Sequence, residues 1–166
     1  MGKNPTDRGK KGTKKSVLVD GDGGPLAVVI APANVNDQML LRETIEAIVV
    51  ERPRPTKARP QNLCLDAAYD NPTGRQAAAA GKYTLHIRPA RQEKKPCEAS
   101  KRHKPRRWVV ERTLGWLSKC RGILVRYDKK DSNYLGLIQL ACALYWYRRL
   151  HRLARCDTST EQAKAS

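Results

Sequence analysis

The chain has 166 residues, with 33 Lys and Arg residues against 16 Asp and Glu residues, so its formal net charge is +17. A chain of this length can form one domain with a buried core. So much positive charge attracts polyanions, and nucleic acid is the first partner to consider. No segment approaches the roughly 20 apolar residues of a membrane span, and the first 15 residues lack the apolar run of a secretory signal. We therefore expect no membrane partner.

The five cysteines indicate neither a disulfide framework nor a zinc site, because they are odd in number and none belongs to a CxxC pair. The three histidines are isolated from one another in the sequence. We expect reduced thiols, surface imidazoles and a cytoplasmic protein.

The N-terminal part combines a basic segment, a hairpin and a helix. Residues 1–15 are rich in Gly, Lys and Thr and are expected to form a flexible segment. Two apolar, β-branched runs at 16–20 and 25–32 flank a Gly/Asp turn and predict a β-hairpin. Apolar residues at helical spacing predict a helix over 37–51, with Asp37 as its cap.

The middle of the chain alternates between strands and a helix. Three prolines exclude a regular element at 51–61, which reads as an exposed basic connection. The stretch 62–70 begins as a short buried strand, and a helix then opens at Asn71-Pro72 and stops at Gly81. A further strand is predicted at 83–89.

The C-terminal part is mainly helical. After the polar, mostly basic residues 90–106, an amphipathic helix is predicted over 108–121. Residues 123–127 could be a short strand or part of a turn, a long helix follows over 132–153, and 154–166 are expected to be a disordered tail. Strands that alternate with helices after an N-terminal hairpin predict one α/β domain with a mixed sheet.

Asp66 is the first candidate for chemistry. It follows the apolar run Leu63-Cys64-Leu65, which places a carboxylate at the carboxyl end of a buried strand, where α/β folds locate their sites. Burying it there without a partner would be costly, so a metal ion or a hydrogen-bond donor is expected. The alternative is a loop or capping Asp, a role for which Asp70 is the better candidate.

Glu111 is the second candidate. A helical wheel places it on the less apolar side of its helix, with Val109 and Thr113 pointing away. The alternative is a solvent-exposed Glu that pairs with Arg107 four residues earlier, although Arg before Glu is the less stabilising order for such a pair on a helix. The wheel leaves both interpretations open. Asp20 could be a third carboxylate, but the sequence DGDGG favours a role in its turn.

Basic residues lie between the two candidate carboxylates, and a site that acts on phosphodiesters needs cations nearby, so DNA contact is predicted. A second cluster in the N-terminal segment supports the same partner. The residues expected to contact DNA are Lys10, Lys11, Lys14, Arg91, Lys94, Lys95, Arg102, Arg106, Arg107 and Lys119.

Five segments, in order and spacing, resemble the DDE transposases of bacterial insertion sequences, in the branch typified by insertion sequence five. The segments read NPTDRGKKGTKKSVLVDGDGGPL, ANVNDQMLL, LCLDAAYDN, HIRP and WVVERTLGWLSKCRGILVRYDK, and the match as a whole runs from about Asn4 to Leu150. The resemblance implies an RNase H-like mixed sheet flanked by helices over 16–153. It also implies three carboxylates that hold two Mg²⁺ (or Mn²⁺) ions for hydrolysis and strand transfer at phosphodiester bonds.

Two of these carboxylates map onto this sequence by their surroundings. The segment Asp66-Ala67-Ala68-Tyr69 resembles the pattern around the family's second Asp. Arg107 and Glu111 match the pattern around its Glu, whereas Lys104 replaces a Tyr and Ser118 stands where the family has a Lys, with Lys119 one position later. These departures concern the auxiliary phosphate contacts.

The resemblance also implies that the first catalytic Asp lies on a strand upstream of the segment like residues 4–14, so the core is expected to lack its first strand. An upstream-frame transposase product could supply that strand, or the chain could be a truncated, non-catalytic nucleic-acid-binding remnant. A standalone nuclease would not explain the WVVERTLGWL block. The implied partners are double-stranded transposon-end and target DNA, with a homo-oligomer left open, in the bacterial cytoplasm at the nucleoid.

Overall fold

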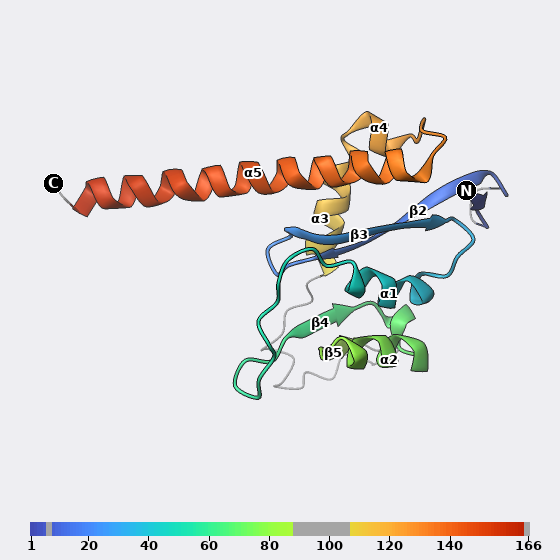
Figure 1. Ribbon diagram of the computed structural model, residues 1–166, viewed down its shortest axis with the longest axis horizontal. Coiled ribbons are helices and arrows are strands. Elements are labelled where there is room, and N and C mark those ends of the chain that lie inside the picture. The colour runs from blue at the N-terminus through green and yellow to red at the C-terminus, as the bar shows by residue number, and fades with distance from the viewer. Residues whose placement is uncertain (6–7, 88–106, 165–166) are drawn as a thin grey trace. The chain divides into compact units, whose positions relative to one another are not determined.

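The computed structural model describes residues 1–5, 8–87 and 107–164 (Figure 1). The chain divides into two compact units, Met1–Leu114 and Gly115–Ser166. Helix α3 (Arg107–Ser118) crosses the division.

The first unit opens with an antiparallel sheet in the order β1-β2-β3, formed by β1 (Gly2–Lys3), β2 (Lys11–Val19) and β3 (Pro25–Pro32). Every second residue of β3 is buried, as expected for a strand with one face on the core. The predicted hairpin is confirmed, but the expectation of a flexible segment was wrong for residues 11–15. Residues 11 and 12 pair with β1 and residues 13–15 pair with the end of β3, so tertiary pairing overrides their weak local strand preference.

A second, parallel sheet of two strands follows in the same unit. It joins β4 (Asn62–Leu65) to β5 (Thr84–Ile87), and the 3₁₀ turn η1 (Ala67–Tyr69) and α2 (Pro72–Ala80) form the crossover between them. We expected one mixed sheet, and the structure has one antiparallel and one parallel sheet instead. No strand within residues 1–5, 8–87 and 107–164 connects β2 to β4.

Both sheets of this unit contribute to one hydrophobic cluster. Helix α1 (Asp37–Glu46) packs against β2 and β3 and also against α2 (Figure 1). The buried members of the cluster are Leu41, Ile45, Leu63, Ala77 and Ala78, with Leu18, Ile48, Leu65, Tyr69, Tyr83 and Leu85 packed around them. Strand β2 and strand β4 therefore share a core although they do not pair.

Helix α1 is shorter than predicted and begins one residue earlier than the expected cap, Asp37, implied. Asn36 is the N-cap, and its side-chain oxygen accepts a hydrogen bond from the Gln38 amide at 3.3 Å, so Asp37 is the first helical residue instead. The helix ends at Glu46 rather than 51. The Val49 amide then donates to the Leu26 carbonyl at 3.4 Å, which ties the following residues to β3.

The second unit consists of the end of α3, α4 (Arg121–Leu124) and α5 (Asp131–Lys164). Leu117, Ile123 and Ile138 are fully buried, and the Tyr134 hydroxyl donates to the Ile123 carbonyl at 2.7 Å. We expected a short strand or part of a turn at 123–127, whereas residues 123 and 124 belong to α4 and residues 125–127 follow it without forming a strand. Helix α5 continues to Lys164, where we expected a disordered tail from residue 154. No helix in the described part of the chain combines the length and apolar character needed to cross a bilayer.

Candidate functional site

Asp66 lies directly after β4 and is exposed to solvent. Leu63 anchors the strand in the core, where it is 5% exposed. The Asp66 carboxylate caps η1 by accepting a hydrogen bond from the Ala67 amide at 2.8 Å. The predicted position at the end of a strand is therefore confirmed, and the carboxylate also has the local capping role that the sequence left open.

Tyr69 and the start of α1 lie close to the segment that carries Asp66. Burial raises the pKa of the Tyr69 phenol, and the negative charges of Asp37 and Asp66 raise this pKa further. Tyr69 therefore lies within electrostatic reach of both carboxylates. The Gln38 side chain donates to the Ala68 carbonyl at 2.6 Å, which fastens the first turn of α1 to η1.

The chain after Asp66 is held by close local contacts. The Asn71 side chain accepts a hydrogen bond from the Gly74 amide at 2.9 Å and so caps α2. A Cβ atom at Gly74 would lie 2.3 Å from the Tyr69 carbonyl oxygen, so only Gly fits this position. These contacts give a structural reason for the sequence DAAYDNPTG around the candidate carboxylate.

Glu111 is exposed on α3, and the burial of this helix confirms the helical wheel. Val109 and Thr113 are 3% and 1% exposed and form the face opposite to Glu111. The Thr113 hydroxyl donates to the Gly23 carbonyl at 2.7 Å, and Arg112 donates to the Asp22 carbonyl at 2.5 Å. The turn between β2 and β3 thus fixes the part of α3 that presents Glu111.

Asp20 has a structural role in that turn. Its carboxylate accepts hydrogen bonds from the main-chain amides of Asp22 at 2.9 Å and Gly24 at 2.6 Å. These contacts confirm the preferred interpretation of DGDGG as a turn sequence.

The residues predicted to contact DNA fall into three groups. Lys10, Lys11 and Lys119 are exposed. The Lys14 ammonium instead binds Asp37 at 3.0 Å and the Val35 carbonyl at 2.8 Å, which links β2 to the start of α1. The structure does not describe Arg91, Lys94, Lys95, Arg102 and Arg106, and it describes the backbone but not the side chain of Arg107.

The donor chemistry of Asp66 and Glu111 fits Mg²⁺ or Mn²⁺, because both ions prefer carboxylate oxygens. Among the residues for which the structure gives positions, no three or more His, Cys, Asp or Glu side chains form a group that could hold a metal ion. Reasoning from the sequence missed the contacts of Asp37 and Gln38 around Asp66, because they join segments about 30 positions apart.

A family model described as the transposase DDE domain matches residues 2–146. A protein of Burkholderia cepacia described as a transposase for insertion sequence element IS402 is 33% identical over 154 residues, which are 91% of this chain and 70% of that protein. No solved structure matches the chain. The residues matched by the family model include both Asp66 and Glu111.

Proposed function

Because the chain belongs to the transposase DDE domain family, we propose that it is the catalytic core of a bacterial insertion-sequence transposase. In this role it acts on phosphodiester bonds at transposon ends by hydrolysis and strand transfer. The observation that carries the proposal is the exposed Asp66 at the carboxyl end of β4, within the sequence that the family model matches. RNase H-like architecture is part of the same proposal.

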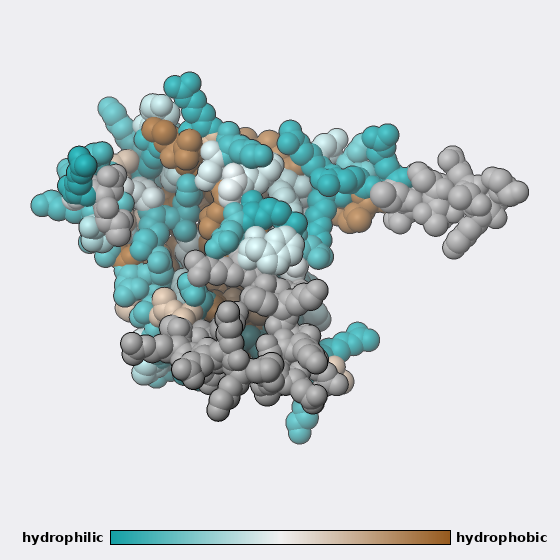
Figure 2. Space-filling view, turned by 180° about the vertical axis from the view of Figure 1, so that it is seen from behind, coloured by the Kyte–Doolittle hydropathy of each residue, from teal (hydrophilic) through white to brown (hydrophobic). Residues whose placement is uncertain are grey.

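The proposed partner is double-stranded DNA, both as transposon end and as target. The net charge of +17 favours binding to phosphates with release of their counterions. In Figure 2, hydrophilic side chains cover much of the described surface on the face that this view shows. The exposed Lys10, Lys11 and Lys119 are the described contacts in this proposal.

Asp66 and Glu111 are the proposed metal ligands and catalytic residues. Bound Mg²⁺ or Mn²⁺ would polarise the phosphodiester and lower the pKa of an attacking water. The role of the two side chains is to provide oxygen donors at fixed positions, Asp66 through the end of β4 and Glu111 through the anchored α3. Preorganised ligands matter because Mg²⁺ requires a nearly ideal octahedral geometry.

We further propose that a strand from outside residues 1–166 completes the site with a third carboxylate, either in a longer form of the chain or as an upstream-frame product. From Ser16 to Val19, β2 has a strand partner on one side only among the residues described, and so has β4. Leu18 of β2 and Leu65 of β4 pack against the same cluster. Strand edges with free hydrogen-bonding groups favour pairing with an added strand.

The second candidate function is a non-catalytic nucleic-acid-binding remnant of a transposase. One observation favours it: the described residues contain no group of three metal-ligating side chains. The two proposals agree on DNA binding and differ on whether an added strand creates an enzyme.

Two measurements test the proposed function. First, the affinity of the chain for duplex DNA is measured as a function of salt concentration, and we expect a steep salt dependence with little sequence preference. An affinity that does not change with salt, or binding to one sequence only, would contradict DNA binding through the net positive charge of the chain. Second, Mg²⁺-dependent cleavage of a transposon-end duplex is compared for the chain alone and with the segment encoded directly upstream, in cis or as a separate chain.

We expect cleavage only when the upstream segment is present. Cleavage by the chain alone would contradict the added strand, and Asp20 would then be the next carboxylate to substitute. Absence of cleavage in both arms, with DNA binding retained, would favour the non-catalytic remnant.

A further inference from the structure

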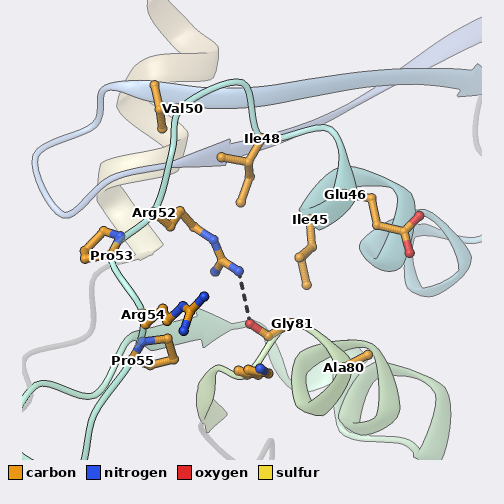
Figure 3. A pocket seen from close by; sticks show the side chains of 11 residues that line it. Ile45, Glu46, Ile48, Val50, Arg52, Pro53, Arg54, Pro55, Ala80 and Gly81 are labelled. Carbon is orange, nitrogen blue, oxygen red and sulfur yellow. Dashed lines mark hydrogen bonds between the residues drawn. The ribbon is translucent and has the colours of Figure 1, made fainter.

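The first unit contains a pocket of about 810 Å³ that is separate from Asp66 and Glu111. The end of α1, the proline-rich connection after it and the end of α2 form its walls (Figure 3). Apolar side chains of Ile45, Ile48 and Val50 line one part, and the cationic side chains of Arg52, Arg54 and Lys82 line another. This combination suits a ligand with an anionic group next to a less polar one.

The connection is held in place although its prolines exclude a helix or a ladder. Arg52 donates to the Gln61 side chain at 3.0 Å and to the Gly81 carbonyl at 3.2 Å, and its guanidinium lies 4.4 Å from the centroid of the Tyr83 ring. Gln61 in turn donates to the Pro53 carbonyl at 2.7 Å. Arg52 therefore serves the structure of the wall rather than a ligand.

Arg54 and Lys82 are exposed cations that both line the pocket, Arg54 from the proline-rich connection and Lys82 from the segment after α2. Figure 3 shows the Arg52 and Arg54 side chains extending from the connection toward Gly81. Arg54 lies between Pro53 and Pro55, whose fixed φ angles reduce the entropy lost when its backbone is ordered. Lys82 follows α2 with a φ of 57°, and its amide donates to the Ala79 carbonyl at 2.9 Å.

One carboxylate lines the pocket, and it already has a cationic partner. Glu46 accepts a hydrogen bond from the Arg42 side chain one helical turn earlier, at 2.9 Å. The lining residues thus carry three positive charges against one negative charge. An anion is the ligand that this balance favours.

We propose that this pocket binds a phosphodiester of the DNA backbone, with Arg54 and Lys82 at the phosphate and the apolar wall against the adjoining sugar. The inference rests on the proposed function, because it assumes that DNA is the partner. Arg and Lys side chains supply most of the protein's electrostatic affinity for phosphates, and such contacts position DNA without reading its sequence. The pocket would give the core a further DNA contact besides the exposed Lys10, Lys11 and Lys119.

The test compares two double charge reversals in the full chain. Arg54→Glu with Lys82→Glu alters the pocket, and Lys57→Glu with Arg59→Glu alters exposed residues of the same connection that do not line it. Each double variant lowers the formal net charge by four from +17, so the general electrostatic effect is matched. Thermal unfolding of both variants checks that they remain folded.

Duplex affinity is measured from low to high salt for the wild-type chain and both variants. We expect the pocket variant to bind at least about tenfold more weakly than the control, and its salt slope to be smaller than that of the control by about one, for the one phosphate that the pocket no longer holds. Equal losses of affinity and slope in the two variants would overturn the pocket as a phosphate site. A wild-type chain that does not bind DNA would instead overturn the proposed function itself.

Discussion

The hydroxyl of Thr113 donates a 2.7 Å hydrogen bond to the main-chain carbonyl of Gly23, 90 positions earlier in the chain. Thr113 is 1% exposed and lies two residues after Glu111 on α3. The helix that presents a candidate catalytic carboxylate is therefore fastened to the β2–β3 turn by one buried contact. Changes at either end of this contact should affect both stability and the position of Glu111.

We predict that Thr113→Val destabilises the protein although it keeps the shape of the side chain. The substitution leaves the buried Gly23 carbonyl without its hydroxyl donor, and a buried polar group that loses its partner costs about 1–3 kcal/mol. The free energy of unfolding in urea measures the effect. Thr113→Ser retains the hydroxyl and is the control. If Thr113→Ser lowered the free energy of unfolding as much as Thr113→Val does, the hydrogen bond would not be the cause.

Gly23→Ala is predicted to be more harmful than Gly9→Ala. Both glycines have positive φ angles, 92° and 72°, so both substitutions carry backbone strain of about 1 kcal/mol. At Gly23 a Cβ atom would also lie 3.0 Å from the Thr113 hydroxyl and from an Arg112 nitrogen, whereas at Gly9 it would meet nothing within 4 Å. The difference between the two unfolding free energies isolates this contact, and no difference would argue against it.

The Cys142 thiol should resist alkylation in the native protein at pH 8. Burial raises its pKa to about 11, so the neutral thiol predominates until the pH approaches that value. Only the thiolate is nucleophilic, and its fraction at pH 8 is about one in a thousand for a pKa near 11. Mass spectrometry after iodoacetamide treatment should show the exposed Cys64 modified before Cys142. Equal rates of alkylation of Cys64 and Cys142 at pH 8 would contradict the burial of Cys142.

Local signals in the sequence predicted the parts of the fold that depend on neighbouring residues. The β-branched run of β3, the start of α2 at Asn71-Pro72 and the position of Asp66 after β4 all agree with the structure. The start of β2 at Lys11 was missed because it depends on pairing with β1 and, from Thr13, with the end of β3. Helix α1 ended early because Val49 binds the Leu26 carbonyl, a contact that no local pattern indicates.

The surroundings of the candidate site were even less accessible to sequence reasoning. Gln38 reaches the Ala68 carbonyl from 30 positions away, and Lys14 binds Asp37 rather than remaining available on a flexible segment. Both contacts exist only because α1 packs between segments that are distant in the chain. The separation of the strands into two sheets is likewise a property of tertiary pairing and not of any single strand.

The central claim is that Asp66 and Glu111 act together as catalytic carboxylates. The most direct measurement is the initial rate of Mg²⁺-dependent cleavage of a transposon-end duplex by the chain supplied with its upstream segment, for Asp66→Asn and Glu111→Gln. Asp70→Asn and Glu43→Gln are the matched controls, because they neutralise exposed carboxylates on η1–α2 and α1. DNA affinity is measured in parallel.

We predict that each of the two variants loses about 10³-fold or more in cleavage rate with little change in DNA affinity, because metal coordination contributes several kcal/mol to the transition state. The two controls should retain most of their activity. Cleavage at a near wild-type rate by either Asp66→Asn or Glu111→Gln would contradict the claim.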